Sequence, residues 1–150
     1  MSLNEEVELL RNIPLFAKLE PSKLKLLAFT SERITYKADQ VLFRQGDFGD
    51  AAYIIVEGAA AVLVETGEGE IEVATLGRND FVGEIAILCD VPRTATVKAT
   101  TQTITLRITK DLFFRLVAEF PEMSVEIMRE LASRLEHTTQ QLREALAKNA

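Results

Sequence analysis

The stretch FVGEIAILCDVPRTATV, residues 81–97, interrupts an otherwise strand-like sequence and decides the fold. Its Gly-Glu pair precedes about one turn of good helix formers. Pro92-Arg93 then leads through small hydroxyl residues into a strand. This order predicts a short helix inserted between two strands. The start of a helix offers unpaired backbone N–H groups and a partial positive charge, so the segment suits a small anion.

Three side chains give this predicted anion site its chemistry. Gly83 lets a ligand come close to the backbone. Arg93 can grip a phosphate with a two-pronged guanidinium fork, which lysine cannot copy. Glu84 is repelled by phosphate, so a sugar hydroxyl is the natural partner of its carboxylate. The pattern predicts a ligand that joins a phosphate to a sugar.

Strand-like runs lie on both sides of this stretch, separated by turn formers. They fall at residues 34–36, 41–43, 53–56, 59–64, 71–73 and 103–108. Short strands at intervals of about 8–12 residues are typical of an antiparallel roll or sandwich. No crossover helices interleave them, so a parallel α/β sheet is not expected.

Helical periodicity returns at both ends of the chain. Residues 3–12 predict an amphipathic helix that Pro14 ends, and Pro21 opens a second helix. The apolar surface expected for that second helix consists of Leu24, Leu26, Leu27 and Phe29. Thr109 is a fair N-cap for a third helix that Pro121 ends. A last helix is expected from Glu122 to about Lys148, because no Gly or Pro interrupts that stretch.

The last helix carries a coiled-coil seam with one polar step. Its members are Met128, Leu131, Leu135, Thr138, Leu142 and Ala145. The seam favours a homodimer over simple packing against the roll. The predicted fold is mainly β with flanking helices: an antiparallel double-stranded β-helix, or jelly roll. It has N-terminal helices, a short helix within the roll and a long C-terminal helix. One domain, 1–150, is expected, divided into a helical segment 1–30, a roll 31–109 and C-terminal helices 110–150.

Composition limits the classes of function. A net charge of −6 argues against a broad nucleic-acid surface, and no nucleic-acid-binding element is predicted. The one histidine, His137, cannot build a multi-histidine metal site, and no Ser-His-acid arrangement is apparent. The one cysteine, Cys89, is expected to be a small buried hydrophobe. No apolar run is long enough to span a membrane, and no leader pattern opens the chain, so a cytoplasmic location is expected.

The stretch 81–97 resembles the phosphate-binding cassette of the cyclic-nucleotide-binding family. That family includes regulatory subunits of cAMP-dependent kinase, cyclic-nucleotide-gated channels and bacterial catabolite activators. Its pattern is Phe-x-Gly-Glu, a few apolar residues, a short spacer, then Arg-(Thr/Ser/Ala)-Ala. The matching residues here are Phe81, Gly83, Glu84, Ile85, Ala86, Arg93, Thr94 and Ala95. Similar turns at 42–47 and 53–58, and the segment 13–16, extend the resemblance over about residues 10–142.

The resemblance implies a role for each matching residue. Arg93 would pair with the cyclic phosphate, Glu84 would take the ribose 2′-hydroxyl, and Gly83 would give access to the ribose. The remaining implied contacts are backbone N–H donors at Ile85, Ala86 and Ala95, Thr94 beside phosphate and base, and Val62 and Val73 lining the base pocket. Residues 133–139 resemble the dimer helix of the catabolite activators, where hydroxyls at the positions of Thr138 and Thr139 reach the adenine.

The expected function is therefore regulatory binding of a cyclic nucleotide, without an enzyme activity, a metal or a cofactor. Ligand entry is expected to move the C-terminal helices. cAMP is favoured because the dimer helix looks bacterial, while Thr94 keeps cGMP possible. Two alternatives remain open: a degenerate interaction domain that binds no ligand, and a cupin-like metal enzyme on a similar roll.

Overall fold

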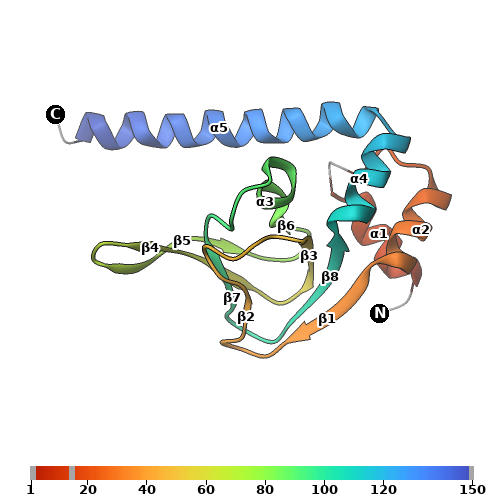
Figure 1. The fold of residues 1–150 in the computed structure, drawn as a ribbon, viewed down its shortest axis with the longest axis horizontal. Helices are drawn as coiled ribbons and strands as arrows, with labels where there is room; N and C mark the ends of the chain where they lie inside the picture. The colour runs from red at the N-terminus through yellow and green to blue at the C-terminus, as the bar shows by residue number, and fades with distance from the viewer. Residues whose placement is uncertain (1–2, 14–15, 149–150) are drawn as a thin grey trace. The chain divides into compact units, whose positions relative to one another are not determined.

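The computed structural model describes residues 3–13 and 16–148 (Figure 1). Pro14, expected to end the first helix, and Leu15 of the family-like segment 13–16 lie outside the described residues. The elements, in chain order, are α1 Leu3–Arg11, α2 Pro21–Thr30, β1 Glu32–Tyr36, β2 Val41–Phe43, β3 Ala51–Glu57, β4 Ala60–Thr66, β5 Gly69–Leu76, β6 Phe81–Val82, α3 Glu84–Cys89, β7 Thr96–Ala99, β8 Thr103–Thr109, α4 Lys110–Glu119 and α5 Glu122–Lys148. The predicted order of helices, strands, an inserted short helix, and helices again is confirmed.

The chain divides into two compact units, Met1–Phe113 and Phe114–Ala150. The first unit holds the two N-terminal helices, all the strands, α3 and the first turn of α4. The second holds the rest of α4 and the whole of α5. The predicted assignment of residues 1–150 to one domain stays a prediction.

The strands of the first unit form two four-stranded sheets (Figure 1). One has the order β1-β8-β3-β6 and the other β2-β7-β4-β5. Every strand pair in the two sheets is antiparallel. Strands that are distant in sequence pair side by side, as β1 does with β8, which closes the chain into the predicted jelly roll.

Apolar side chains from both sheets meet inside the roll. The buried cluster consists of Leu42, Tyr53, Ile55, Ala60, Val97 and Ala99. The partly buried residues Tyr36, Phe43, Val62, Leu76 and Val82 pack against it. Strand β3 is buried at every residue from Ala51 to Val56, as expected of a strand covered on both faces.

Helix α2 begins at Pro21 as predicted, and α1 ends at Arg11, one residue before the predicted end, but only part of the predicted apolar surface of α2 is buried. Leu24 and Leu27 are fully buried, three positions apart on one helix face. Leu26 is 49% exposed and Phe29 is 80% exposed, so the expectation that these two pack inward was wrong. Both lie on the opposite face of α2, because i and i+2 positions of a helix point apart.

Three aromatic rings connect the N-terminal segment, the start of the inserted stretch and the start of α4. The Phe81 ring meets Phe16 edge-on at a centroid distance of 5.7 Å. It also stacks on Phe113 at 6.1 Å. Phe16 and Phe113 are fully buried, so Phe81 anchors the stretch 81–97 on the core of the first unit.

Candidate ligand-binding site

The stretch 81–97 folds as predicted, with the six-residue helix α3 between β6 and β7. Gly83 stands at the N-cap of α3 with φ +92°, a left-handed conformation that glycine adopts without steric cost. Asp90 ends the helix in the same left-handed region, and its N–H donates to the carbonyl of Ala86. These two reversals fix the length of the helix and direct the chain back toward the strands.

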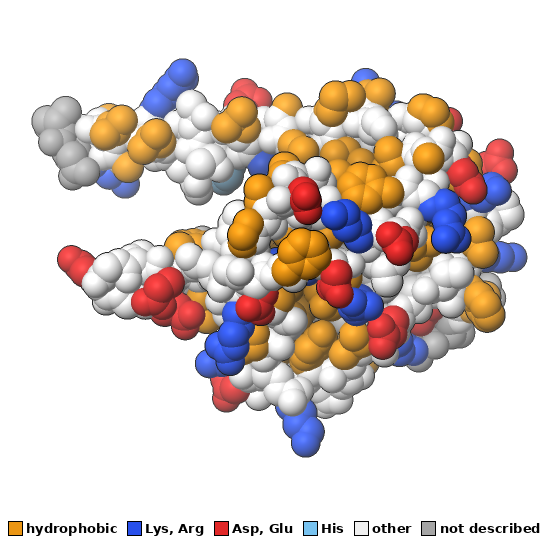
Figure 2. Space-filling view, viewed as in Figure 1, with side chains coloured by type: hydrophobic (Ala, Val, Ile, Leu, Met, Phe, Trp, Pro, Cys, Tyr) orange, Lys and Arg blue, Asp and Glu red, His pale blue; other side chains and the backbone are white. Residues whose placement is uncertain are grey.

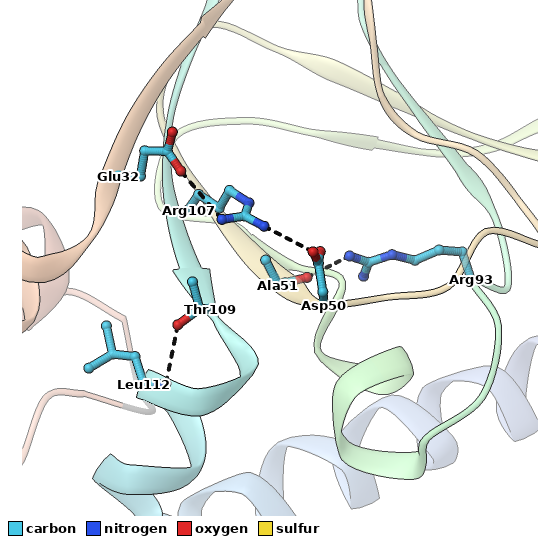
Figure 3. Close-up of polar contacts among 7 residues, drawn as sticks. All are labelled: Glu32, Asp50, Ala51, Arg93, Arg107, Thr109 and Leu112. Atoms are coloured by element: carbon cyan, nitrogen blue, oxygen red, sulfur yellow. Dashed lines mark hydrogen bonds and ion pairs between the residues drawn. The ribbon is translucent and has the colours of Figure 1, made fainter.

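Arg93 lies inside this loop and is only 4% exposed. Its Nη1 donates to the carbonyl of Gly83 at 2.7 Å. Its Nη2 donates to the carbonyl of Ala51 at 2.6 Å, as Figure 3 shows. Its Nε is buried and has no hydrogen-bond partner among the described residues. The guanidinium carbon also lies 4.0 Å from the centroid of the Phe43 ring. The site therefore holds a buried cation that keeps one donor free for a ligand.

Burial lowers the pKa of Arg93 from its usual range, and nearby Tyr53 and Asp50 act in the opposite direction. A desolvated guanidinium is stabilised by any anion that replaces its lost hydration. The electrostatic state of Arg93 therefore favours a bound anion.

Two glycines make room for the guanidinium. A Cβ at Gly83 would lie 2.7 Å from Nη1 of Arg93. A Cβ at Gly49 would lie 2.5 Å from the Cβ of Ala86 and 3.0 Å from Cζ of Arg93. Backbone hydrogen bonds also join the turn that contains Gly49 to Arg93. The N–H of Gly46 donates to the carbonyl of Arg93, and the N–H of Arg93 donates to the carbonyl of Asp47, both at 2.8 Å.

Glu84, the first residue of α3, is 6% exposed and directly follows the carbonyl that Arg93 binds. The structure thus brings Gly83, Glu84 and Arg93 into one place. Ala86 is buried, Ala95 is half-buried, and Ile85 and Thr94 are exposed. All of these predicted residues belong to the same loop.

The residues predicted to contact the base differ in burial and lie in both units of the chain. Val62 packs against the interior cluster of the roll. Val73, on the neighbouring strand, is 57% exposed and lies at a β-bulge between the pairs Val62–Ala74 and Leu63–Glu72. Thr138 and Thr139 lie on α5 in the second unit, where both are exposed.

Several residues of the site were missed by the sequence analysis. Phe43 and Gly49 shape the space around Arg93, and Ala51 supplies a carbonyl to it. Gly49 stands in a run of turn formers, which hides its packing role. Cys89 was expected to be buried and is exposed. The inward face of α3 carries Glu84 and Ile87, one turn apart, and Cys89 falls on the other side.

A groove of about 700 Å³ is lined by Thr35, Tyr36, Asp39, Gln40, Val41, Leu42, Phe43, Arg44 and Asp47, none of them a predicted site residue. Within residues 3–13 and 16–148, no three His, Cys, Asp or Glu side chains are grouped to hold a metal ion. No helix in the described part of the chain combines the length and apolarity needed to cross a membrane.

The sequence profile of the cyclic nucleotide-binding domain matches residues 33–120, which contain both the roll and the loop around Arg93. The chain therefore belongs to the cyclic nucleotide-binding domain family. The chain is thus a regulatory domain of the cyclic nucleotide-binding type.

Named relatives agree with this assignment. The cAMP-dependent protein kinase regulatory subunit of Dictyostelium discoideum is 36% identical over 123 residues, which are 79% of this chain and 36% of that protein. The CRP-like cAMP-activated global transcriptional regulator of Mycobacterium tuberculosis is 28% identical over 90% of this chain and 61% of that protein. The solved catabolite activator protein of Thermus thermophilus has a TM-score of 0.79 at 28% identity, over 86% of this chain and 61% of that one. The chain spans less than two thirds of the length of each.

Proposed function

We propose that the chain binds cAMP in preference to cGMP. Arg93 pairs with the cyclic phosphate, and Glu84 accepts a hydrogen bond from the ribose 2′-hydroxyl. The observation that carries the phosphate contact is the buried Nε of Arg93, which has no hydrogen-bond partner in the described part of the chain. A buried donor without a partner costs free energy, and a phosphate oxygen removes that cost.

The remaining contacts are proposed on the family pattern. Gly83 leaves space for the ribose, and Thr94 lies beside the phosphate and the base. Backbone N–H groups of Ile85, Ala86 and Ala95 donate to the phosphate. Val62 and Val73 line the base pocket. The contact of Thr138 and Thr139 with the base stays a prediction.

The choice of cAMP rests on relatives whose names contain that nucleotide, the kinase regulatory subunit and the CRP-like regulator. cGMP remains the second candidate, because the exposed hydroxyl of Thr94 is available to a guanine.

Titration calorimetry with cAMP, cGMP and 5′-AMP tests the proposal. cAMP is expected to bind most tightly, and 5′-AMP more weakly because its phosphate is not ring-closed. Arg93→Ala is expected to weaken cAMP binding by about 2–5 kcal/mol, which is a loss of thirtyfold to several thousandfold. Equal affinity in Arg93→Ala and the unaltered chain would refute the role of Arg93. Tighter binding of cGMP would reverse the preference.

We further propose that binding is transmitted to the C-terminal helices and involves no catalysis. Lys110, the first residue of α4, donates its backbone N–H to the carbonyl of Asp50 at 2.8 Å. Its Nζ lies 3.5 Å from the carboxylate of Asp90, at the end of α3. A shift of α3 on ligand binding would therefore act directly on the start of α4. Hydrogen exchange of α4 and α5 with and without cAMP tests this, and unchanged rates would contradict it.

We also propose that the chain forms a homodimer through the exposed apolar side chains of α5. Its exposed apolar side chains recur along the helix in Figure 2, and include Met128, Leu135, Leu142 and Leu146. Met128, Leu135 and Leu142 recur every seven residues, which is the spacing of a coiled-coil seam, and Leu146 lies beside the seam position Ala145. A cytoplasmic location stays a prediction.

A further inference from the structure

The carboxylate of Asp50 lies between two arginines and bonds to only one of them (Figure 3). Nη2 of Arg107 lies 3.2 Å from Oδ2 of Asp50. On the other side, Arg93 reaches past Asp50 to the backbone carbonyl of the next residue, Ala51. Asp50 therefore pairs with Arg107, whereas Arg93 lies nearby without forming an ion pair with it.

Arg93 is within electrostatic reach of Asp50 even though no ion pair joins them. Asp50 is among the groups that raise the pKa of Arg93 against the lowering effect of burial. The polar contacts that Arg93 makes through its side chain are with two carbonyls, and neither carries a full negative charge. The Asp50 side chain is 67% exposed, so it has room to rotate toward Arg93.

Arg107 is well placed to prevent that rotation. It projects from β8, where it pairs with Tyr53 of β3, and Asp50 immediately precedes β3. Its other terminal guanidinium nitrogen, Nη1, lies 3.3 Å from Oε2 of Glu32. These two carboxylates hold Arg107 between them, and its side chain is only 22% exposed.

We propose that Arg107 is a positioning residue for the ligand site: it retains Asp50 and so keeps the positive charge of Arg93 uncompensated for an anionic ligand. This inference rests on the proposed function. Without Arg107, the Asp50 carboxylate pairs with Arg93 and competes with the phosphate. A competing pair formed in about 80% of molecules leaves about one fifth competent and weakens apparent binding about fivefold.

The test compares four proteins by calorimetry with cAMP: the unaltered chain, Arg107→Gln, Glu32→Gln, and the double variant Arg107→Gln with Asp50→Asn. Arg107→Gln is expected to bind about fivefold more weakly. Glu32→Gln removes the charge of the other partner of Arg107 but keeps an amide oxygen that can accept the hydrogen bond from Nη1, so this variant is expected to bind as the unaltered chain does. The double variant is expected to recover the lost affinity, because the amide of Asn carries no competing charge.

A second measurement does not depend on the nucleotide. The Nε–H resonance of Arg93 in the free protein, identified by its loss in Arg93→Lys, is expected to shift in Arg107→Gln and to return in the double variant. Full affinity in Arg107→Gln overturns the inference. A weakened Arg107→Gln that the Asp50→Asn change does not restore also overturns it, because a merely structural role would give that result. If no nucleotide binds the unaltered chain, the proposed function fails, and the Arg93 resonance still decides whether Arg107 restrains Asp50.

Discussion

The guanidinium of Arg93 stacks over the ring of Phe43, with 4.0 Å between Cζ and the ring centroid. Phe43 belongs to β2, whereas Arg93 lies in the loop after α3, so the contact joins two distant segments. A cation over an aromatic face is stabilised by about 0.5–2 kcal/mol, more when it is desolvated. Phe43 thus holds the buried guanidinium from β2, while Nε of Arg93 has no hydrogen-bond partner among the described residues.

Phe43→Leu is expected to weaken cAMP binding by about three- to tenfold, because leucine keeps much of the volume but offers no π face. Calorimetry measures the change. Phe48→Leu is the control, since Phe48 is 75% exposed and the cation near its ring is Lys110, at 5.9 Å from the centroid. Equal losses in both variants would show that the Phe43 ring has no specific role.

Gly49→Ala is expected to lower the free energy of unfolding by about 1–3 kcal/mol and to weaken ligand binding. The added Cβ would lie 2.5 Å from Ala86 Cβ and 3.0 Å from Arg93 Cζ, so both α3 and the guanidinium must move. Denaturant unfolding and calorimetry measure the two effects.

Gly67→Ala is the matched control for this prediction, because nothing lies within 4 Å of a Cβ built at Gly67. It is expected to leave stability and affinity nearly unchanged. Should Gly49→Ala behave like Gly67→Ala, the close packing around Arg93 would be disproved.

The sequence was most informative where Gly and Pro residues mark the ends of helices and strands, or where their absence allows a long helix. Gly83 and Pro92 mark the ends of the inserted segment, and α5 runs between the predicted bounds because no helix breaker interrupts it. The antiparallel roll followed from strand spacing and from the absence of crossover helices. In each case the signal lies within a few residues of the element that it specifies.

Contacts between distant segments were the part that could not be predicted. Nothing near Arg107 indicates that it faces Asp50, because the pair forms only after β8 aligns with β3. The stacking of Phe43 on Arg93 depends in the same way on the closure of the roll. Short helices are similarly difficult: one residue of rotation decides whether Cys89 is buried or exposed.

Tyr36 should make stability fall between about pH 10 and pH 12. Burial, followed by the charge and hydrogen bond of Tyr53, raises the pKa of Tyr36 from 10.0 to about 12. The unfolded chain therefore loses this proton near pH 10, while the folded chain keeps it until about pH 12. The stabilisation is complete below pH 10 and disappears as the pH rises through 12.

The chain has two tyrosines and no tryptophan, so tyrosinate absorbance reports these two groups alone. Tyr36→Phe is expected to remove the late-titrating component and to reduce the alkaline loss of thermal stability. Comparison with this variant cancels the titration of lysines. Ionisation of Tyr36 near pH 10 in the folded protein would contradict the prediction.

Leu135→Glu and Leu142→Glu are expected to convert a homodimer into a monomer. Leu135 is 68% exposed and Leu142 is 59% exposed, and the two stand one heptad apart on α5. Full burial of a leucine contributes about 1.5–3 kcal/mol, and a symmetric interface loses two for each substitution. Dimerisation should therefore weaken by about a hundredfold or more. Sedimentation velocity measures the change, with Ser133→Glu, an exposed position off the seam, as the control. Because these leucines are exposed in the single chain, the substitutions should leave the thermal unfolding of the first unit unchanged. If the unaltered chain sediments as a monomer at every concentration, the apolar seam of α5 does not join two copies.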